Sequence, residues 1–331
     1  MSNELEIWQF IAPRLKNGEA VMLLVVAESS GSSPGRAGYK MAVSADGELC
    51  GSIGGGVMEV TLVEQSKAIL SEPPPAIAGC STPILIEQEH RKNSEQPSGM
   101  ICSGRQTVIL KALGSNELEA VEVAITDLQQ GEEPWLVISE VEFKTAPANT
   151  EPQNCPLPSF ERMDDIFHYI DKLGPKNELY IIGGGHCALA LSEVMSRLDF
   201  KIRVFDDRPD LSTLEKNRFA HHVTILNHYD LIEHQIWGED NIYVVVMTLG
   251  YKSDEVVIRR LFDRNFKYFG VLGSKAKMKT LLSTFEKEGF DKDRINRIHT
   301  PVGLPINSHT PEEIAISIAA EIIAVKNGKS Y

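Results

Sequence analysis

The sequence predicts an α/β protein of two domains, a mixed α+β domain followed by a domain built on a parallel sheet. Its 331 residues exceed the usual size of a single hydrophobic core. Prolines among Thr, Asn, Gln and Ser in residues 144–160 are typical of an extended linker. Beyond it, strand-like runs alternate with helical patterns, as in parallel sheets covered on both faces. We therefore expect domains at 1–143 and 161–331, joined by the linker 144–160.

The first domain mixes helices and strands without regular alternation. Apolar residues at helical spacing predict helices over residues 4–16, 57–70 and 117–130. Apolar runs predict strands over residues 20–27, 40–44, 48–53, 83–87, 106–110 and 135–141. The turn dipeptide Asp46-Gly47 joins the second and third of these strands.

The second domain alternates strand and helix more regularly. Strands are predicted over residues 178–182, 201–205, 222–226, 241–248 and 268–272. Helices are predicted over residues 161–173, 186–197, 253–264, 275–288 and 311–325. The last helix has a well-formed start, because Pro311 follows the N-cap candidate Thr310 and precedes two glutamates. This order predicts a parallel sheet with helices on both faces.

A glycine-rich turn follows the first strand of the second domain. Gly183, Gly185 and Ala188 fit the pattern G-x-G-x-x-A between a strand and a helix. Asp206 ends the next strand, 21 residues after Gly185, where such folds place a ribose contact. The helix N-terminus would offer N–H groups to a phosphate. We therefore expect a Rossmann-like fold whose ligand is held by Gly183, Gly185, His186 and Asp206.

The kind of ligand stays open at this point. Asp207 would repel the 2′-phosphate of NADP whereas Arg208 would accept it, so the turn suits NAD, NADP or no nucleotide. A dehydrogenase would also need an acid that polarises its substrate, and no residue of the sequence stands out in that role. The alternative is a Rossmann-like fold whose crevice serves another ligand.

Two glycine-rich loops stand in the first domain. The segment 51–56 holds four glycines, and the segment 31–38 is also rich in small and turn-forming residues. Such density indicates positive φ angles or the close approach of another group. The loops therefore predict either an anion or cofactor site or a pair of tight turns. The candidate ligand-binding residues here are Ser32, Ser33, Arg36, Lys40, Gly54, Gly55 and Gly56.

Cysteine and histidine supply further candidates. Five scattered cysteines without a C-x-x-C pair argue against a disulfide framework and a structural zinc site. Cys102, in a loop flanked by glycines, is either a packed thiol or an accessible one suited to sulfur chemistry or to a metal. Cys50 and Cys187 are expected to pack. His299, in a turn-rich loop near the end of the sheet, is a further candidate ligand-binding residue.

Charge and hydropathy exclude several classes of function. A formal charge of −13 disfavours nucleic acids and anionic membranes, whose phosphates attract clustered lysine and arginine. No apolar run is long enough to span a bilayer, and the acidic N-terminus lacks the features of a signal peptide. We therefore expect a cytoplasmic protein that binds a small ligand or another protein.

Taken in order, these motifs resemble the xanthine dehydrogenase accessory factor (XdhC/CoxI) family over nearly the whole chain. The motifs are Gly31-Ser32-Ser33-Pro34, Gly51-Ser52-Ile53-Gly54-Gly55-Gly56, Gly183-Gly184-Gly185-His186, Asp206-Asp207-Arg208, Arg297-Ile298-His299 and Thr310-Pro311-Glu312-Glu313. The resemblance implies a two-domain protein, commonly a homodimer, that binds and protects molybdenum cofactor (molybdopterin). It also implies two partners: a cysteine desulfurase that supplies the terminal sulfido ligand, and the molybdenum hydroxylase apoenzyme that receives the cofactor.

The sequence departs from the family pattern after the triple glycine. Relatives typically have Cys there, whereas this chain has Val57, so a thiol contact to molybdenum or sulfur is missing at that point. Cys102 matches the second family cysteine and is the candidate metal contact, although Ser103 replaces the glycine that follows it. Leu249 after Thr248 also alters a Thr-His motif of the family.

The resemblance therefore implies a molybdenum cofactor chaperone rather than a turnover enzyme. The phosphate of the pterin would lie against backbone N–H groups of the glycine loops or of the Rossmann turn. Arg36, Lys40 and Cys102 would assist. The alternatives are an NAD(P)-dependent oxidoreductase that uses the Rossmann turn, and a dimeric scaffold whose cofactor role has decayed.

Overall fold

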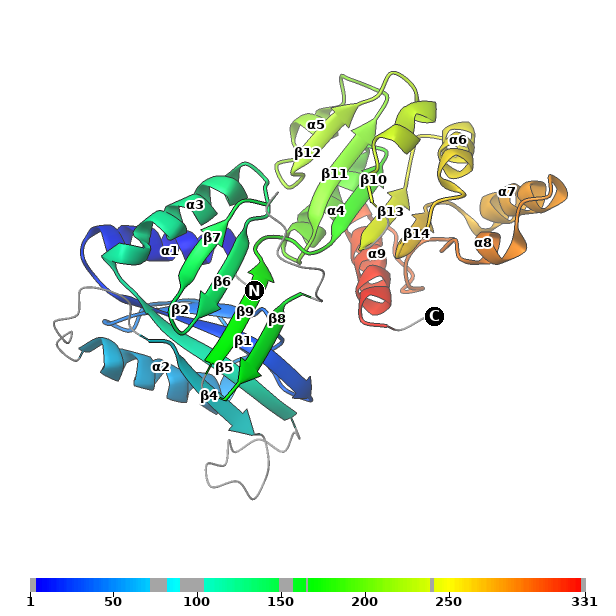
Figure 1. Cartoon of the computed structure of the whole chain (residues 1–331). Helices are drawn as coiled ribbons and strands as arrows, with labels where there is room; N and C mark the ends of the chain where they lie inside the picture. Colours follow the sequence, from blue (N-terminus) through cyan, green and yellow to red (C-terminus); the bar gives the residue numbers. More distant parts are fainter. Residues whose placement is uncertain are drawn as a thin grey trace. The chain divides into compact units, whose positions relative to one another are not determined.

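The computed structural model describes residues 4–71, 82–89, 104–148, 157–164, 166–238 and 241–328. The chain divides into two compact units, Met1–Gly174 and Pro175–Tyr331, and Figure 1 labels most of their elements. Each unit has its own sheets and its own hydrophobic core. The expected fold class, a mixed α+β unit followed by a Rossmann-like unit on a parallel sheet, is confirmed.

The first unit contains two antiparallel sheets, of order β3-β2-β1-β5-β4 and β7-β6-β9-β8. The larger sheet comprises β1 (Val21–Gly31), β2 (Lys40–Ser44), β3 (Leu49–Gly51), β4 (Ile84–Glu89) and β5 (Gly104–Leu113). The smaller sheet comprises β6 (Trp135–Ser139), β7 (Phe143–Ala146), β8 (Ser159–Met163) and β9 (Ile166–Lys172). The helices are α1 (Glu4–Lys16), α2 (Gly56–Ser71), the short η1 (Ser115–Glu117) and α3 (Leu118–Gln129).

Strand β1 is buried on both faces, and this determines how the first unit is layered. Met22, Leu24 and Val26 point to one face, where they pack with β2, β5 and α2. Leu23 and Val25 point to the other face, where they pack with α1, α3 and the smaller sheet. Because side chains alternate along a strand, the continuous apolar run of β1 serves both cores.

The predicted helix over residues 161–173 is wrong, because this segment forms the end of β8, a turn and β9. Phe167 and Tyr169 are buried while Ile166 and His168 are exposed, so the buried positions repeat every two residues rather than every 3.6. Both strands belong to the first unit, which extends to Gly174 rather than ending at residue 143. Strand β7 and the start of β8 occupy parts of the expected linker, whose residues 149–156 lie outside the described ones.

The second unit is built on five parallel strands in the order β12-β11-β10-β13-β14. The strands are β10 (Glu178–Ile182), β11 (Lys201–Asp206), β12 (His222–Ile225), β13 (Ile242–Val246) and β14 (Tyr268–Val271). The helices are α4 (His186–Ser196), α5 (Ser212–Glu215), η2 (Tyr229–His234), α6 (Tyr251–Leu261), α7 (Lys275–Lys287), α8 (Lys292–Asn296) and α9 (Pro311–Lys326). The strand order reverses beside β10, and folds of this type bind ligands at that point.

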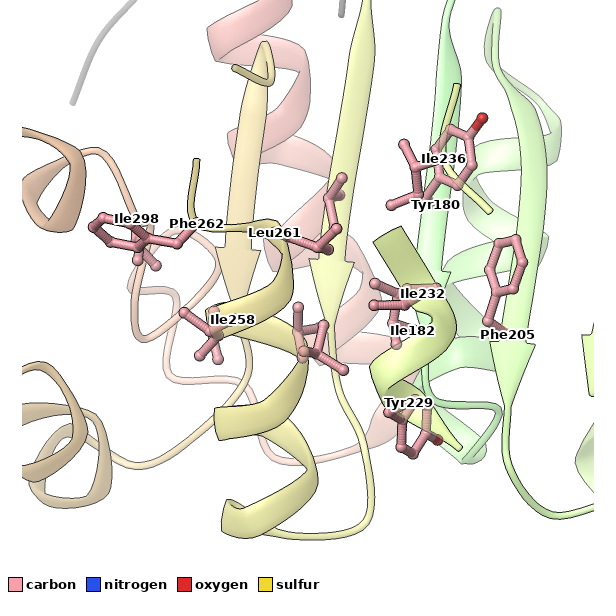
Figure 2. Packing of buried hydrophobic residues seen from close by; sticks show 14 of the residues in the cluster. Tyr180, Ile182, Phe205, Tyr229, Ile232, Ile236, Ile258, Leu261, Phe262 and Ile298 are labelled. Carbon is pink, nitrogen blue, oxygen red and sulfur yellow. The ribbon is translucent and has the colours of Figure 1, made fainter. Parts of the chain in front are cut away.

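Helices cover both faces of the parallel sheet. On one face, α4 and α9 pack against each other and against the strands through a cluster that includes Leu191 and Ile318. The other face carries η2, α6, α7 and α8. Figure 2 shows Ile232 of η2 and Leu261 of α6 in the same cluster as Ile182 of β10. With both faces covered, the ends of the strands are the part of the sheet left for a ligand.

Candidate functional site

The glycine turn after β10 is shaped by close backbone contacts at its first two residues. Gly183 has a φ of +112°, and a Cβ added there would lie 2.2 Å from the carbonyl oxygen of Met247. A Cβ on Gly184 would lie 2.4 Å from Cδ2 of Leu214. At Gly185 an added Cβ would meet none of the described atoms within 4 Å. The first two glycines therefore allow the chain to turn, and the third leaves open space in front of α4.

That open space is part of a crevice of about 460 Å³ at the carboxyl ends of the strands. Its lining comprises Gly185, His186, Cys187, Ala188, Arg208, Leu211, Ser212, Thr213, Met247, Thr248, Leu249 and Leu272. The volume falls in the range of small-molecule sites, about 300–1,000 Å³. Among the residues that the structure describes, the lining holds no carboxylate, although the chain carries a formal charge of −13.

The N-terminus of α4 faces this crevice without a side-chain cap. Gly185 is the N-cap residue, and within the described chain no side chain accepts a hydrogen bond at this cap. The first turn of α4 also contains no acidic residue. An uncapped helix N-terminus carries partial positive charge and free N–H groups, so it favours an anionic ligand.

Asp206, the predicted ribose contact, is fully buried and its carboxylate is already occupied. Its Oδ2 accepts hydrogen bonds from the N–H of Gly184 at 2.6 Å and from Nη2 of Arg208 at 2.8 Å. Its Oδ1 accepts from the backbone N–H and from Nε of Arg208, at 2.9 and 2.8 Å. Burial alone would raise the pKa of Asp206, but the hydrogen bonds from Arg208 and Gly184 outweigh it and lower this pKa.

Arg208 is the residue of this pair that faces the crevice. Its side chain is 33% exposed and contributes to the lining, whereas Asp206 does not. The guanidinium uses Nε and Nη2 on Asp206, and Asp207 lies 4.0 Å from Nε. Within the described chain, Nη1 makes no hydrogen bond, so the arginine keeps donors for a ligand.

The hydroxyl groups of Thr213 and Thr248 in the lining are held by hydrogen bonds within the protein. Thr213 donates its hydroxyl to the carbonyl oxygen of Gly184. Thr248 donates its hydroxyl to Oδ1 of Asp254 at 2.6 Å. Burial, and after it the carboxylate of Glu312, raise the pKa of the Cys187 thiol. Cys187, which the sequence assigned to packing, therefore borders the crevice as a neutral thiol rather than as a thiolate.

The first-domain glycine loop at residues 51–56 already contains a carboxylate. Oε2 of Glu59 accepts hydrogen bonds from the N–H of Ile53 at 2.9 Å, the N–H of Gly55 at 3.0 Å and the hydroxyl of Ser52 at 2.7 Å. Gly54, Gly55 and Gly56 all have positive φ angles, which turn these N–H groups toward one point. The loop has the shape of an anion site, but Glu59 fills it.

The two glycine loops pack directly on each other. A Cβ on Gly35 would lie 2.2 Å from the carbonyl oxygen of Ile53, and one on Gly54 would lie 2.4 Å from the backbone nitrogen of Gly35. Ser33 is buried and donates to Oε1 of Gln106 at 2.8 Å. Ser32 and Arg36 are exposed on the same loop. The loops therefore contact one another, and Ser33 is used in packing.

Lys40 does not lie on a ligand surface. Its side chain is 2% exposed, and its ammonium lies 2.6 Å from Oδ2 of Asp171 and 2.7 Å from Oε1 of Glu4. Burial alone would lower the pKa of Lys40, but these carboxylates outweigh it and raise this pKa. The lysine joins α1, β2 and β9 inside the first unit, which is a structural position rather than the anion contact that the sequence suggested.

His299 also lies away from the crevice lining. Its Nδ1 is 3.1 Å from Oε1 of Glu321 in α9, and its ring packs on Tyr268 with centroids 4.6 Å apart. Glu321 further accepts hydrogen bonds from the hydroxyl of Tyr268 and the N–H of Gly303. The structure thus brings Gly185, His186 and Arg208 together at one crevice and places His299 elsewhere.

Some expectations cannot be placed, and some residues at the crevice were not foreseen. Cys102 lies outside the described residues. Within the described chain, no three His, Cys, Asp or Glu side chains are grouped to hold a metal ion, and no helix is long and apolar enough to cross a membrane. Thr213, which lines the crevice, and Asp254, which holds Thr248, were missed. Each lies on the helix that follows a strand, Thr213 on α5 after β11 and Asp254 on α6 after β13, and this is the one sequence signal that could have identified them.

Comparisons with known proteins match both parts of the chain. A family model described as the XdhC Rossmann domain matches residues 179–322, and one described as the XdhC and CoxI family matches residues 14–77. A Bacillus subtilis (strain 168) protein, named there as a probable xanthine dehydrogenase subunit, is 27% identical over 335 aligned residues, which cover 94% of this chain and 95% of that protein.

Two further likenesses are weaker. The uncharacterized protein YqeB of Escherichia coli (strain K12) is 25% identical over 305 residues, covering 91% of this chain but only 43% of that longer protein. A crystal structure described as a xanthine dehydrogenase from Bacillus halodurans is 20% identical and has a TM-score of 0.70, with 99% of this chain and 97% of that chain covered. The second likeness bears on the fold alone.

Proposed function

Because this chain belongs to the XdhC family, we propose that it is an accessory protein that binds molybdenum cofactor. In this role it assists sulfuration of the cofactor and its insertion into xanthine dehydrogenase or a related molybdenum hydroxylase. The name of the Bacillus subtilis relative supports xanthine dehydrogenase as the enzyme served. The task is binding and transfer rather than turnover.

The crevice beside β10 is the observation that carries this proposal. Molybdenum cofactor is a pterin with a phosphate at one end and a metal held by sulfur at the other. The crevice offers an uncapped helix N-terminus and Arg208 for the phosphate, and it offers Met247, Leu211 and Leu272 as apolar walls for a ring. The residues present therefore fit the phosphate and the ring system.

The glycine loop of the first unit is the poorer of the two phosphate candidates. Glu59 already accepts hydrogen bonds from the N–H groups of Ile53 and Gly55 there, and a second anion would have to displace a carboxylate from its own chain. The crevice has no such occupant among the described residues. We therefore place the phosphate against Gly185, His186 and Arg208.

Sulfur chemistry depends on a partner in this proposal. When bound, the cofactor supplies the molybdenum that takes up the sulfido ligand. Val57 stands on the first turn of α2, 58% exposed, where relatives typically have a thiol. Cys187 borders the crevice with a raised pKa, so it is a poor sulfur nucleophile at neutral pH. A cysteine desulfurase is therefore the proposed sulfur donor.

The proposal is tested by isolating the protein from a host that makes the cofactor. The full chain is purified, its pterin is oxidised to a fluorescent form, and the pterin is counted per protein chain. We expect the amount of pterin per chain to be stoichiometric in the wild type and lower in Arg208→Gln. Arg218→Gln is the matched control, because Arg218 is exposed in the same unit and does not line the crevice. Absence of pterin from cells with an active molybdenum enzyme would overturn the proposal.

The partners are tested separately. Light scattering of the purified chain checks the proposed homodimer, and a mass of 36.7 kDa would show a monomer instead. Co-purification with a cysteine desulfurase and with an apo molybdenum hydroxylase checks the proposed transfer steps. A chain that carries pterin but contacts neither partner would be a cofactor store rather than an insertion factor.

The alternative function, an NAD(P)-dependent oxidoreductase, rests on the position of the crevice in a Rossmann-like fold. The occupied carboxylate of Asp206 speaks against NAD, since its oxygens already accept four hydrogen bonds. Reduction of NADP or NAD with any substrate by the purified chain would favour this alternative over the proposal.

A further inference from the structure

Asp206 and Arg208, at the end of β11, determine which chemical group of a ligand the crevice can bind there. In dinucleotide-binding folds, a free carboxylate at this position accepts hydrogen bonds from the ribose hydroxyls, whereas a nearby arginine accommodates a 2′-phosphate. In this chain the carboxylate of Asp206 is fully buried beneath Arg208 and the guanidinium lies on the surface of the crevice.

We infer that the crevice selects a ligand by a phosphate monoester at the end of β11 and rejects a ribose diol there. Arg208 is the group that contacts the phosphate, and Asp206 is a positioning residue that holds the guanidinium. The inference rests on the proposed function only where the phosphate is that of the pterin. The 2′-phosphate of NADP has the same chemistry and is the other source of such a group.

The hydrogen bonds of Asp206 leave no acceptor for a ribose diol. A ribose diol needs carboxylate lone pairs, but both oxygens of Asp206 already accept two donors each, at 2.6 to 2.9 Å. One of those donors is the N–H of Gly184 in the glycine turn, so the carboxylate cannot turn away without opening the turn itself. A diol placed here would leave its hydroxyls without acceptors, which is costly when the site is dry.

The donors and charges around Arg208 favour an anionic ligand. Anchoring by Nε and Nη2 fixes the plane of the guanidinium and leaves Nη1 for a ligand. The lining supplies a further partial positive charge from the N-terminus of α4, and among the described lining residues none is acidic. The acids that contact or act on lining residues are Asp206, Asp207, Asp254 and Glu312, and none of them lines the crevice. An anion with oxygens on several sides fits this arrangement, whereas a neutral diol does not.

NADPH and NADH form the matched pair of probes, because they differ only by one phosphate monoester on the ribose. Calorimetry uses the full chain from a host that cannot make the pterin, at constant ionic strength. We expect NADPH to bind at least about tenfold more tightly than NADH, as one charge-assisted contact requires. The preference should fall below about pH 6, where the dianion of a phosphate monoester takes up one proton and becomes a monoanion. NADH binding as tightly as NADPH, or no binding of NADPH at millimolar concentration, would overturn the inference.

Variants of Arg208 and Asp206 distinguish the residue that contacts the phosphate from the residue that positions it. Arg208→Gln should abolish the preference, Arg208→Lys should keep part of it because a point charge remains without the fork, and Arg218→Gln should keep all of it. Asp206→Asn keeps the size but not the charge, and we expect it to lower the NADPH preference while NADH binding stays weak. A wild-type preference in Arg208→Gln would show that another group reads the phosphate.

The pterin content of the same variants distinguishes the two sources. If Arg208→Gln loses both pterin and the NADPH preference, the phosphate read in the cell is that of the pterin. If it loses the preference but keeps the wild-type pterin content, the group read is that of a nucleotide. If the wild type carries no pterin yet prefers NADPH, the proposed function fails and this inference stands.

Discussion

The ammonium of Lys40 lies 2.6 Å from the carboxylate of Asp171, and both side chains are almost completely buried. The two residues are 131 positions apart, and the pair fixes β9 to β2 within the first unit. Glu4 adds a second carboxylate from α1 at 2.7 Å. The ammonium of Lys40 therefore supplies compensating charge to two carboxylates, one fully buried and one with its side chain 18% exposed.

Lys40→Met should destabilise the first unit by about 3–5 kcal/mol, because it leaves those carboxylates uncompensated. Urea unfolding followed by tryptophan fluorescence measures this, since Trp8 and Trp135 are buried in the first unit while Trp237 is exposed. Lys67→Met is the control, because Lys67 pairs only with the exposed Glu64 among the described residues. Wild-type stability of Lys40→Met with loss of bound pterin would instead identify Lys40 as a ligand contact.

Glu59→Ala should destabilise the same unit by about 2 kcal/mol, because the N–H groups of Ile53 and Gly55 lose a charged acceptor. Glu59→Gln keeps an acceptor oxygen and should cost less. The same fluorescence measurement compares the two variants. If Glu59→Ala were as stable as the wild type, the glycine loop would not depend on Glu59 for its conformation, and our reason for excluding this loop as a phosphate site would fail.

Val57→Cys introduces the thiol that the family resemblance implies at this position. Val57 is 58% exposed on the first turn of α2, so the change should alter stability by less than about 0.5 kcal/mol. The new thiol should react readily with a thiol reagent in the folded protein. If thiol contact aids cofactor retention in this family, Val57→Cys also retains more pterin, and Val60→Cys, one turn along on the same exposed face, is the matched control. Equal pterin in both variants would argue against a thiol role at this loop.

The pair of Glu321 and His299 should make the stability of the second unit fall in acid. Burial alone would raise the pKa of Glu321, but hydrogen bonds from His299, Tyr268 and Gly303 outweigh it and lower this pKa. A carboxyl with a lowered folded pKa contributes stability above its ordinary pKa, and this contribution is lost as the pH falls below about 4.5. Urea unfolding followed by circular dichroism at a series of pH values measures it. Glu321→Gln should flatten the acid limb, and an unchanged limb would contradict this account.

The sequence was sufficient to predict elements with a strong local signal. The apolar run of β1, the Thr310-Pro311 helix start and the glycine turn at Gly183 each occur where local chemistry indicated them. The segment at β9 was misread because Ile166, Tyr169, Ile170 and Leu173 also suit a helical spacing. Only pairing with β6 and β8 decides between helix and strand. Such pairing joins residues far apart in the chain and has no local signature.

Candidate site residues were harder to assign than elements, because a residue type does not specify its partner. The position of Lys40 beside the glycine loops suggested an anion contact. In the fold, Lys40 instead forms an ion pair with Asp171, which lies far along the chain. Asp206 stood at the right offset for a ribose, but its neighbour Arg208 occupies it. In both cases the hydrogen bonds and ion pairs within the fold decided which side chain remained available.

Gly183→Ala and Gly185→Ala should separate the fold of the glycine turn from its ligand. At Gly183 the positive φ and the Met247 carbonyl, 2.2 Å from an added Cβ, predict a loss of about 2–3 kcal/mol and a weakened second unit. At Gly185 the φ is −73° and the space is open, so alanine should cost only about 0.5–1 kcal/mol as a poorer N-cap. The new methyl group would nevertheless stand in front of the first N–H groups of α4. Gly185→Ala should therefore stay folded by circular dichroism while its pterin content and NADPH affinity fall, and full binding in this variant would move the phosphate away from the α4 N-terminus.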